Sequence, residues 1–212
     1  MAFNPAQPGN TPIFHITEIG NLPSVMQFGG LFSDAAMNVG GASPVVIGHS
    51  HIKQRRLTQY RVACAGNRFV GEFVPFYYAP RMPMLYTANL GSTGRPPGCQ
   101  KDIVHLVSSV QLAINLGRDW AIADCNAGSS YATFTNQISS LSGLNWTAID
   151  AQYWQQCGSA KQAEFLVADH FEWHAIRLIG CMNQAAANRV TQILQGQAHQ
   201  PKVVVRRDWY YP

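Results

Sequence analysis

No apolar run in the 212-residue chain reaches the roughly 18 residues that a membrane-spanning helix requires. The N-terminus also lacks a cationic stretch followed by an apolar segment, which is the pattern of a secretory leader. We therefore expect a cytoplasmic protein with no membrane-spanning segment.

The chain also lacks the paired cysteines of a disulfide framework. Its five cysteines are odd in number, scattered along the chain, and include no C-x-x-C pair. This spacing favours reduced thiols, which agrees with a cytoplasmic location.

Charged residues are scarce, at 12% of the chain, whereas hydrophobic residues reach 47%. This balance is typical of a globular protein and argues against intrinsic disorder. For 212 residues we expect one domain covering residues 1–212, in which residues 1–11, with Pro5, Pro8 and Gly9, form a loose leader.

Several nucleotide and catalytic motifs are absent. No G-x-G-x-x-G follows an expected strand, no G-x-x-x-x-G-K-[ST] occurs, and there is no G-x-S-x-G. These absences argue against a Rossmann dinucleotide site, a P-loop nucleotidase and a hydrolase of the G-x-S-x-G type. The nearest approach to a metal motif is HFEWH. In a strand that runs into a turn, its His170 and His174 would not share a face, so no metal is expected.

Acidic residues are nearly absent from one long segment. Between Asp34 and Asp102 the chain carries eight basic residues and the single acid Glu72, a net charge of +7, against −3 for the remainder. A polyanion, either nucleic acid or a phosphorylated small molecule, is the natural partner of such a segment. A solvated basic face would have the same composition.

Residues 125–149 contain no charged residue and are rich in Ser, Thr and Asn. A connection this long and irregular is uncommon unless it has a function, although an ordinary surface loop remains the alternative. Hydrogen bonds and stacking can read base edges, which phosphate attraction cannot. Tyr131, Phe134 and Asn136 are therefore candidate contacts to a target base.

Short strands interleaved with short helices indicate an α+β fold. Strands are expected at residues 12–17, 102–107 and 120–124 and within 163–171, 176–182 and 201–211, and helices at 21–29, 50–62, 108–117, 149–154 and 183–196. The aromatic stretch 72–86 is interrupted by Pro75, Pro80 and Pro83, so we expect short extended pieces at a sheet edge or along a cleft.

Two groups of aromatic residues have more than one interpretation. The three tyrosines of the 72–86 stretch can belong to the core or line a pocket: Tyr77, Tyr78 and Tyr86. The Trp-Tyr-Tyr end that follows Arg206 and Arg207 can stack on an unpaired base or cap the sheet.

Six blocks of the sequence, taken in order, resemble one known family. They are TPIFHITEIGNLPSV, HIKQRR, VPFYYAPRMPMLY, HLVSSVQ, YW with KQAEFLV, and VVVRRDWYY. Together they resemble the DarT family of bacterial DNA ADP-ribosyltransferase toxins, over about residues 11–211.

The resemblance implies the ADP-ribosyltransferase fold, in which a split pair of β-sheets holds NAD in the cleft between them. It implies that Glu164 of the KQAEFLV block and Arg56 of the RR pair are catalytic. The residues implied to contact NAD are His15, Thr17, Ser24, Arg56 and Tyr77. The residues implied to contact the target are Tyr131, Phe134, Asn136 and Arg206.

The chemistry of the transfer suits a carboxylate at the start of the apolar run after Glu164. Positive charge develops on the ribose as its bond to nicotinamide breaks, and a carboxylate stabilises that charge more than it stabilises intact NAD. Arg56 stays protonated and is a poor base, so we expect it to stabilise a deprotonated thymine or the phosphates of NAD.

The resemblance thus implies a toxin that consumes NAD, attaches ADP-ribose to thymidine in single-stranded DNA, needs no metal, and is countered by a macrodomain antitoxin. Bases in a duplex hide the edge that must react, so an unpaired strand is expected. The alternatives are modification of guanine, RNA or a small molecule, or a non-catalytic module that binds single strands.

Overall fold

The computed structural model of the protein describes residues 3–40, 50–155 and 157–212. Its centre is an eight-stranded sheet in the order β12-β11-β6-β1-β5-β9-β7-β8. The strands of this sheet are β1 (Pro12–Glu18), β5 (Phe73–Tyr77), β6 (Ile103–Ser109), β7 (Trp120–Ala123), β8 (Phe134–Thr135), β9 (Glu164–Ala168), β11 (Leu178–Cys181) and β12 (Lys202–Val205). Two small sheets pair β2 (Gly30–Phe32) with β10 (His170–Glu172), and β3 (Arg61–Val62) with β4 (Arg68–Phe69).

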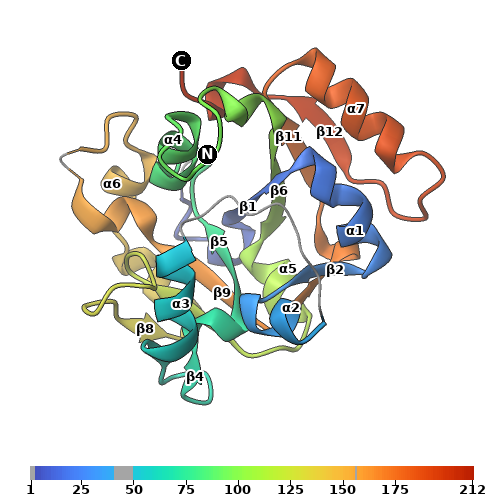
Figure 1. Cartoon of the computed structure of the whole chain (residues 1–212). Helices are drawn as coiled ribbons and strands as arrows, with labels where there is room; N and C mark the ends of the chain where they lie inside the picture. Colours follow the sequence, from blue (N-terminus) through green and yellow to red (C-terminus); the bar gives the residue numbers. More distant parts are fainter. Residues whose placement is uncertain (1–2, 41–49, 156) are drawn as a thin grey trace.

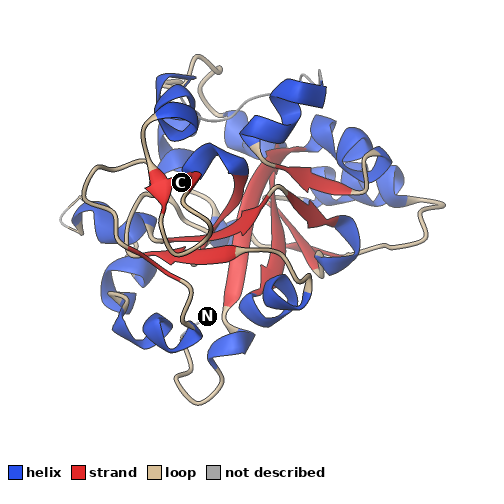
Figure 2. Cartoon of the chain, turned by 90° about the horizontal axis from the view of Figure 1, so that it is seen from below, coloured by secondary structure: helices blue, strands red, loops and turns tan. Residues whose placement is uncertain are grey.

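Helices surround the strands, which lie in the interior (Figure 2). Figure 1 shows α3 and α6 on one side of the molecule and α1 and α7 on the other. The α-helices are α1 (Leu22–Gln27), α2 (Asp34–Gly40), α3 (Ser50–Thr58), α4 (Pro83–Asn89), α5 (Val110–Asn115), α6 (Trp146–Asp150) and α7 (Gln184–Leu194). Within the described ranges no helix has the length and apolar character that crossing a membrane demands.

The large sheet is divided between β1 and β5. β1 pairs with β6 over seven residues, and β5 pairs with β9 over five. β1 and β5 share only the pair Phe14–Tyr77. One half of the sheet is therefore β12-β11-β6-β1 and the other is β5-β9-β7-β8, so the expected α+β fold with a split sheet is confirmed.

Pro75 contributes to this division. It lies in β5 and has no N–H to donate toward β1. Its carbonyl oxygen instead bonds to Nδ1 of His15 at 2.9 Å, a side-chain contact across the division. β5 is thus a short extended piece at the edge of its half-sheet, as the prolines predicted.

The same expectation is wrong further along the 72–86 stretch. Pro83 begins α4, where its missing N–H costs nothing because the first N–H groups of a helix have no partner in the helix. The helix expected at 149–154 is also wrong over most of its length, because α6 spans Trp146–Asp150 and residues 151–154 are not helical. Asn145 caps α6 by accepting a hydrogen bond from the Ala148 N–H at 3.0 Å.

The expected loose leader contacts the rest of the protein from its third residue onward. The ring of Phe3 stacks on Trp146 of α6, with a centroid distance of 4.5 Å and an interplanar angle of 3°. Pro8–Asn10 form a turn of 3-10 helix immediately before β1.

The aromatic C-terminus caps the sheet and does not offer a stacking surface. Trp209, Tyr210 and Tyr211 are all buried. The Tyr210 hydroxyl donates to the carbonyl oxygens of Ile103 at 2.9 Å and Gly180 at 3.0 Å, and so ties the end of the chain to β6 and β11. Of the two interpretations of this segment, the sheet cap is the one observed.

We predict that Tyr210→Phe lowers the free energy of unfolding by about 1–3 kcal/mol, because two buried carbonyl groups lose their donor while the ring is retained. Urea unfolding followed by tryptophan fluorescence measures the change. Tyr153→Phe is the matched control, since Tyr153 is 85% exposed and its hydroxyl can bond to water. Equal stability of the two variants would contradict the assigned role of the Tyr210 hydroxyl.

Candidate active site

The register of the sheet places several predicted site residues in one row. Across neighbouring strands the Cα partners are Phe14–Tyr77, Tyr77–Glu164, Glu164–Ala123 and Ala123–Phe134. Directly opposed residues project from the same face of a sheet. Glu164 thus lies on β9 with Tyr77 on one side, and the Phe134 backbone is about 10 Å away on the other side, at two strand spacings.

Glu164 and Arg56 form a buried, two-pronged ion pair. The Glu164 side chain has no exposed surface, and Arg56 is 8% exposed. Nη1 of Arg56 lies 3.2 Å from Oε1 of Glu164, and Nη2 lies 2.9 Å from Oε2. The Ala127 N–H donates a third bond to Oε1 at 3.1 Å. The two residues implied to be catalytic are therefore in direct contact, although 108 positions separate them in the sequence.

The ion pair determines the charge states around it. Burial alone would lower the pKa of Arg56, but the Glu164 carboxylate outweighs it, and the net effect is a raised pKa. Burial and the same carboxylate raise the pKa of the Tyr77 hydroxyl. Arg56 therefore carries its charge and Tyr77 is a neutral hydroxyl at any physiological pH.

Asn126 holds the turn that delivers the Ala127 N–H. Its Oδ1 accepts a bond from the Gly128 N–H at 2.8 Å, and its Nδ2 donates to Oε1 of Gln162 at 3.0 Å. This turn directly follows β7, and Gln162 lies two residues before Glu164. From the sequence, Asn126 was expected only as one of the polar residues of the uncharged segment that could bond to a base. The motif Asn-Ala-Gly after a strand was the available sign of an Asx turn.

The residues expected to contact NAD lie on four elements, β1, α1, α3 and β5. His15 and Thr17 are on β1. Burial lowers the pKa of His15, and its Nδ1 must carry the proton to bond to the Pro75 carbonyl, which leaves Nε2 as an acceptor. The Thr17 hydroxyl accepts a bond from Asn21 at 3.2 Å and retains its own proton to donate. Ser24 is exposed on α1, and its contact with NAD stays a prediction.

The other tyrosines of the 72–86 stretch belong to the core. Tyr78 is 3% exposed and packs edge-on to Trp146. Tyr86 packs against Trp154 and Tyr211.

The expected target-contacting residues of the uncharged segment differ in availability. Tyr131 is 64% exposed. Phe134 is half-buried on β8. The Asn136 amide donates to the Cys64 carbonyl at 3.1 Å, so its N–H group is already partly engaged. Tyr131 is the most accessible of the three for stacking on a base.

The structure does not bring Arg206 together with Glu164. Four strands separate β12, which precedes Arg206, from β9 in the sheet order. Arg206 instead binds Asp208 through two bonds of 2.9 and 2.6 Å, and its guanidinium lies 4.5 Å from the ring centroid of Trp209. Its expected contact with the target is therefore not supported by its position, because a local acid already satisfies it.

Four of the eight basic residues between Asp34 and Asp102 pair with acids. Lys53 pairs with Asp34, Arg56 with Glu164, Arg68 with Glu72 and Asp169, and Arg95 with Glu18. Most of these acids come from outside the segment, so a count along the sequence overstates the free positive charge. The +7 segment is not one continuous cationic face.

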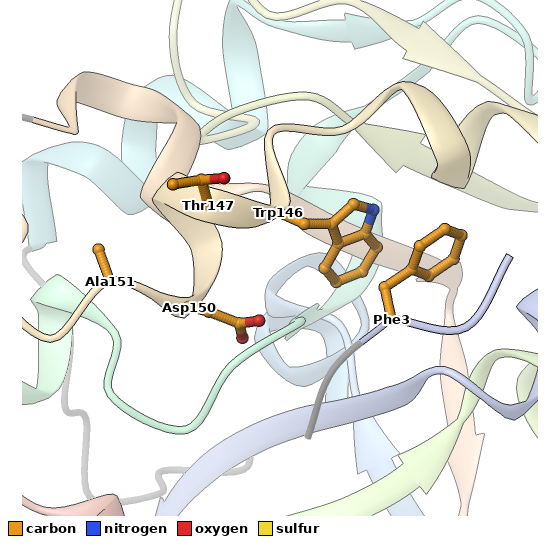
Figure 3. Close-up of a pocket in the computed structure, with 5 residues that line it drawn as sticks. All are labelled: Phe3, Trp146, Thr147, Asp150 and Ala151. Atoms are coloured by element: carbon orange, nitrogen blue, oxygen red, sulfur yellow. The ribbon is translucent and has the colours of Figure 1, made fainter.

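A separate hollow of about 430 Å³ lies at α6 (Figure 3). Its lining residues are Phe3, Trp146, Thr147, Asp150 and Ala151. Figure 3 shows the Phe3 and Trp146 rings side by side, so protein already occupies the stacking face of Trp146. Neither Glu164 nor Arg56 lines this hollow, and the site is defined by their ion pair instead.

Among the described residues no three His, Cys, Asp or Glu side chains gather in a way that could hold a metal ion. His170 lies on β10, where it stacks on Phe32, and His174 is exposed in the turn after it. The five cysteines are free.

The architecture is that of an ADP-ribosyltransferase: a sheet divided between two strands, with a buried carboxylate at the first position of a strand beside the division. Comparison with known proteins gives the family. The family described as "ssDNA thymidine ADP-ribosyltransferase, DarT" matches residues 14–211.

Individual relatives agree with this match over nearly the whole chain. A DNA ADP-ribosyl transferase of Thermus sp. (strain 2.9) is 37% identical over 209 residues, covering 96% of this chain and 98% of that protein. The structure of Thermus sp. 2.9 DarT in complex with ADP-ribosylated ssDNA has a TM-score of 0.87 at 35% identity, covering 95% of this chain and 97% of that one. The complex of Thermus sp. 2.9 DarT with NAD+ has a TM-score of 0.83 at 35% identity, covering 95% and 98%. This chain belongs to the DarT family of DNA ADP-ribosyltransferases.

We predict that Glu164→Ala and Arg56→Ala each lower the free energy of unfolding by about 3 kcal/mol or more, because each leaves a buried charge without its partner. The double substitution should cost clearly less than the sum of the two. Chemical denaturation of the four proteins measures this coupling. Strictly additive losses would show that the buried contact does not join the two side chains in solution.

Proposed function

We propose that this protein transfers ADP-ribose from NAD to thymidine in single-stranded DNA, and that Glu164 and Arg56 carry the transfer. The observation that supports these roles is the buried ion pair itself. A carboxylate with no exposed surface is held in one orientation by a guanidinium and a backbone N–H, in a chain of the DarT family.

The hydrogen bonds to Glu164 leave room for one more donor. A carboxylate has about four acceptor positions, two on each oxygen. Among the described residues, Oε1 accepts from Arg56 and Ala127, whereas Oε2 accepts from Arg56 alone. One position on Oε2 thus remains for a substrate hydroxyl, and we assign it to the 2′-hydroxyl of the ribose that bears nicotinamide.

In the reaction the bond between the ribose C1′ and the nicotinamide nitrogen breaks, and nicotinamide leaves with the bonding electron pair. Positive charge develops on the ribose and lies next to a carboxylate already oriented in a dry site. The carboxylate stabilises the positively charged ribose of the transition state more than it stabilises intact NAD, so it lowers the activation barrier of the transfer. A ring nitrogen of thymine then bonds to C1′ and loses its proton to solvent water.

Arg56 acts on this reaction in two ways. The two terminal nitrogens of its guanidinium bond to both oxygens of Glu164, and this orients the carboxylate. Its charge also favours the negative form of a thymine that has lost its ring proton. Arg56 does not remove that proton, since the adjacent carboxylate raises its pKa further.

The family setting adds two proposals about the cellular context. We expect a macrodomain hydrolase that removes ADP-ribose from the modified DNA to be the antitoxin partner. We also expect the protein to act in the cytoplasm, where NAD and unpaired DNA occur together. Loss of toxicity on co-expression with such a hydrolase, but not with its inactive form, tests the first.

We predict that Glu164→Gln lowers the rate of ADP-ribose transfer by roughly 10²-fold or more, because the side-chain shape is retained and the charge is lost. Mass spectrometry of a thymine-containing oligonucleotide after incubation with NAD measures the transfer, and a thymine-free strand tests the base. Arg56→Ala removes the second residue that is proposed to carry the transfer, and Arg55→Ala is its matched control. Arg55 is exposed and, within the part of the chain that the structure describes, bonds only to its neighbours Gln59 and Tyr60, so its loss should have little effect. Wild-type rates for Glu164→Gln would refute the role of Glu164.

We predict that Tyr131→Ala changes which bases are tolerated beside the target thymidine, while nicotinamide release from NAD without DNA stays nearly unchanged. The exposed ring of Tyr131 belongs to the uncharged segment that leads to Glu164. Sequencing of modified sites in a random oligonucleotide pool measures the preference. Phe28→Ala is the control, because Phe28 is another exposed ring, at 55%, on a different element. An unchanged preference at an unchanged rate would favour an ordinary surface loop.

A further inference from the structure

Residues 3–10, which were expected to be part of a loose leader, are held by a chain of backbone turns. The Gln7 N–H donates to the Asn4 carbonyl at 3.0 Å, and the Asn10 N–H donates to the Gln7 carbonyl at 3.0 Å. The Asn10 amide also donates to the Gln7 side chain at 2.7 Å. β1 follows directly and belongs to the large sheet. Phe3 is therefore presented from a stretch of backbone with a defined course.

This stretch contacts the second half of the uncharged segment at two places. Pro8–Asn10 contact the 3-10 turn η5 (Ile138–Gly143). The ring of Phe3 stacks on Trp146 at the start of α6, with the two ring planes only 3° apart (Figure 3). Together η5 and α6 make up most of residues 138–150. Residues 3–10 thus support the part of the uncharged segment that lies closest in the chain to Glu164.

α6 is held by its side chains, because a helix of five residues is too short to be stable through its own backbone bonds. Ala148 and Ile149 are buried in the core. Trp146 lies at the outer edge, where its Nε1 donates to the Leu141 carbonyl of η5 at 2.8 Å and its ring stacks on Phe3. Loss of the Phe3 ring would extend the neighbouring hollow along one face of Trp146.

α6 is also joined to the strand that carries Glu164. The Lys161 ammonium donates to the Ile149 carbonyl, and Lys161 lies three residues before Glu164. Tyr78, the residue after β5, packs edge-on against Trp146 with a centroid distance of 5.6 Å. α6 therefore lies between Phe3 on one side and the elements of the candidate active site on the other.

We propose that Phe3 is a positioning residue for the DNA substrate. Its ring holds Trp146, and through it α6 and η5, in the arrangement with which the uncharged segment 125–149 contacts the strand. This inference rests on the proposed function, because it assumes that this segment binds DNA. When only a fraction of the molecules has the competent arrangement, the apparent affinity is reduced in proportion to that fraction.

The test compares Phe3→Ala with Phe3→Tyr, which keeps a ring that can stack, and with Phe32→Ala. The last is the matched control, because it removes a ring that stacks on His170 of β10 at 4.2 Å, in another part of the protein. Fluorescence anisotropy measures the affinity for an oligothymidine. Amide hydrogen exchange of residues 138–150 is measured without DNA, and transfer at saturating oligothymidine gives kcat. Thermal unfolding of each variant confirms that the fold is retained.

We expect Phe3→Ala to weaken oligothymidine binding by roughly 3- to 10-fold, the factor that corresponds to one aromatic stack. Amide exchange of residues 138–150 should become faster, while kcat at saturating oligothymidine stays near that of the wild type. Phe3→Tyr should restore both the affinity and the slow exchange. Phe32→Ala should change neither of them.

Wild-type affinity in Phe3→Ala, or an equal loss in Phe32→Ala, overturns the proposal. Weaker binding without faster exchange would mean that Phe3 contacts DNA itself, which also overturns the positioning role. Binding and exchange do not require transfer. A wild-type protein that binds the oligothymidine but transfers no ADP-ribose would therefore refute the proposed function and leave the comparison of the Phe3 variants intact.

Discussion

The buried contact between Arg56 and Glu164 is the interaction on which the rest of the structure depends. Neither charge can be left alone in the interior, so α3 must dock where Arg56 reaches the first residue of β9. The turn after β7 must then supply the Ala127 N–H to the same carboxylate. One ion pair thus fixes three segments of distant sequence, and it also orients the carboxylate that we propose takes part in the transfer.

The division of the sheet is the second constraint, and it follows from the sparse pairing between β1 and β5. A continuous ladder between β1 and β5 would bury both edges and leave no approach to Glu164. Pro75 removes one donor, and the His15 ring supplies a side-chain contact in its place. The two half-sheets remain joined at Phe14–Tyr77, which is also the row that contains Glu164. The pair that joins the half-sheets therefore lies in the same row as the carboxylate proposed to be catalytic.

The free positive charge of this protein depends on which basic residues pair with acids more than on how many basic residues it has. The segment between Asp34 and Asp102 has a net charge of +7, yet acids from distant parts of the chain neutralise several of its cations. The free positive charge of this segment is therefore smaller than its composition indicates. The uncharged segment before Glu164 has the complementary property, since it can contact bases without attracting phosphates.

The sequence by itself determined the strands β1, β6, β7 and β9 and helices α1, α5 and α7, because apolar pattern and capping residues are local signals. The family blocks, which are also local, predicted the roles of Glu164 and Arg56. It could not show that Pro83 starts a helix, because a proline is compatible with both a helix start and an extended piece. It also could not show that Arg206 binds Asp208, because an arginine can bond either to an acid of the protein or to a target. The contact of Arg56 with Glu164 and the Asn126 turn were decided only by tertiary structure. They join residues far apart in the chain, and no local propensity records which buried charge a distant arginine will meet.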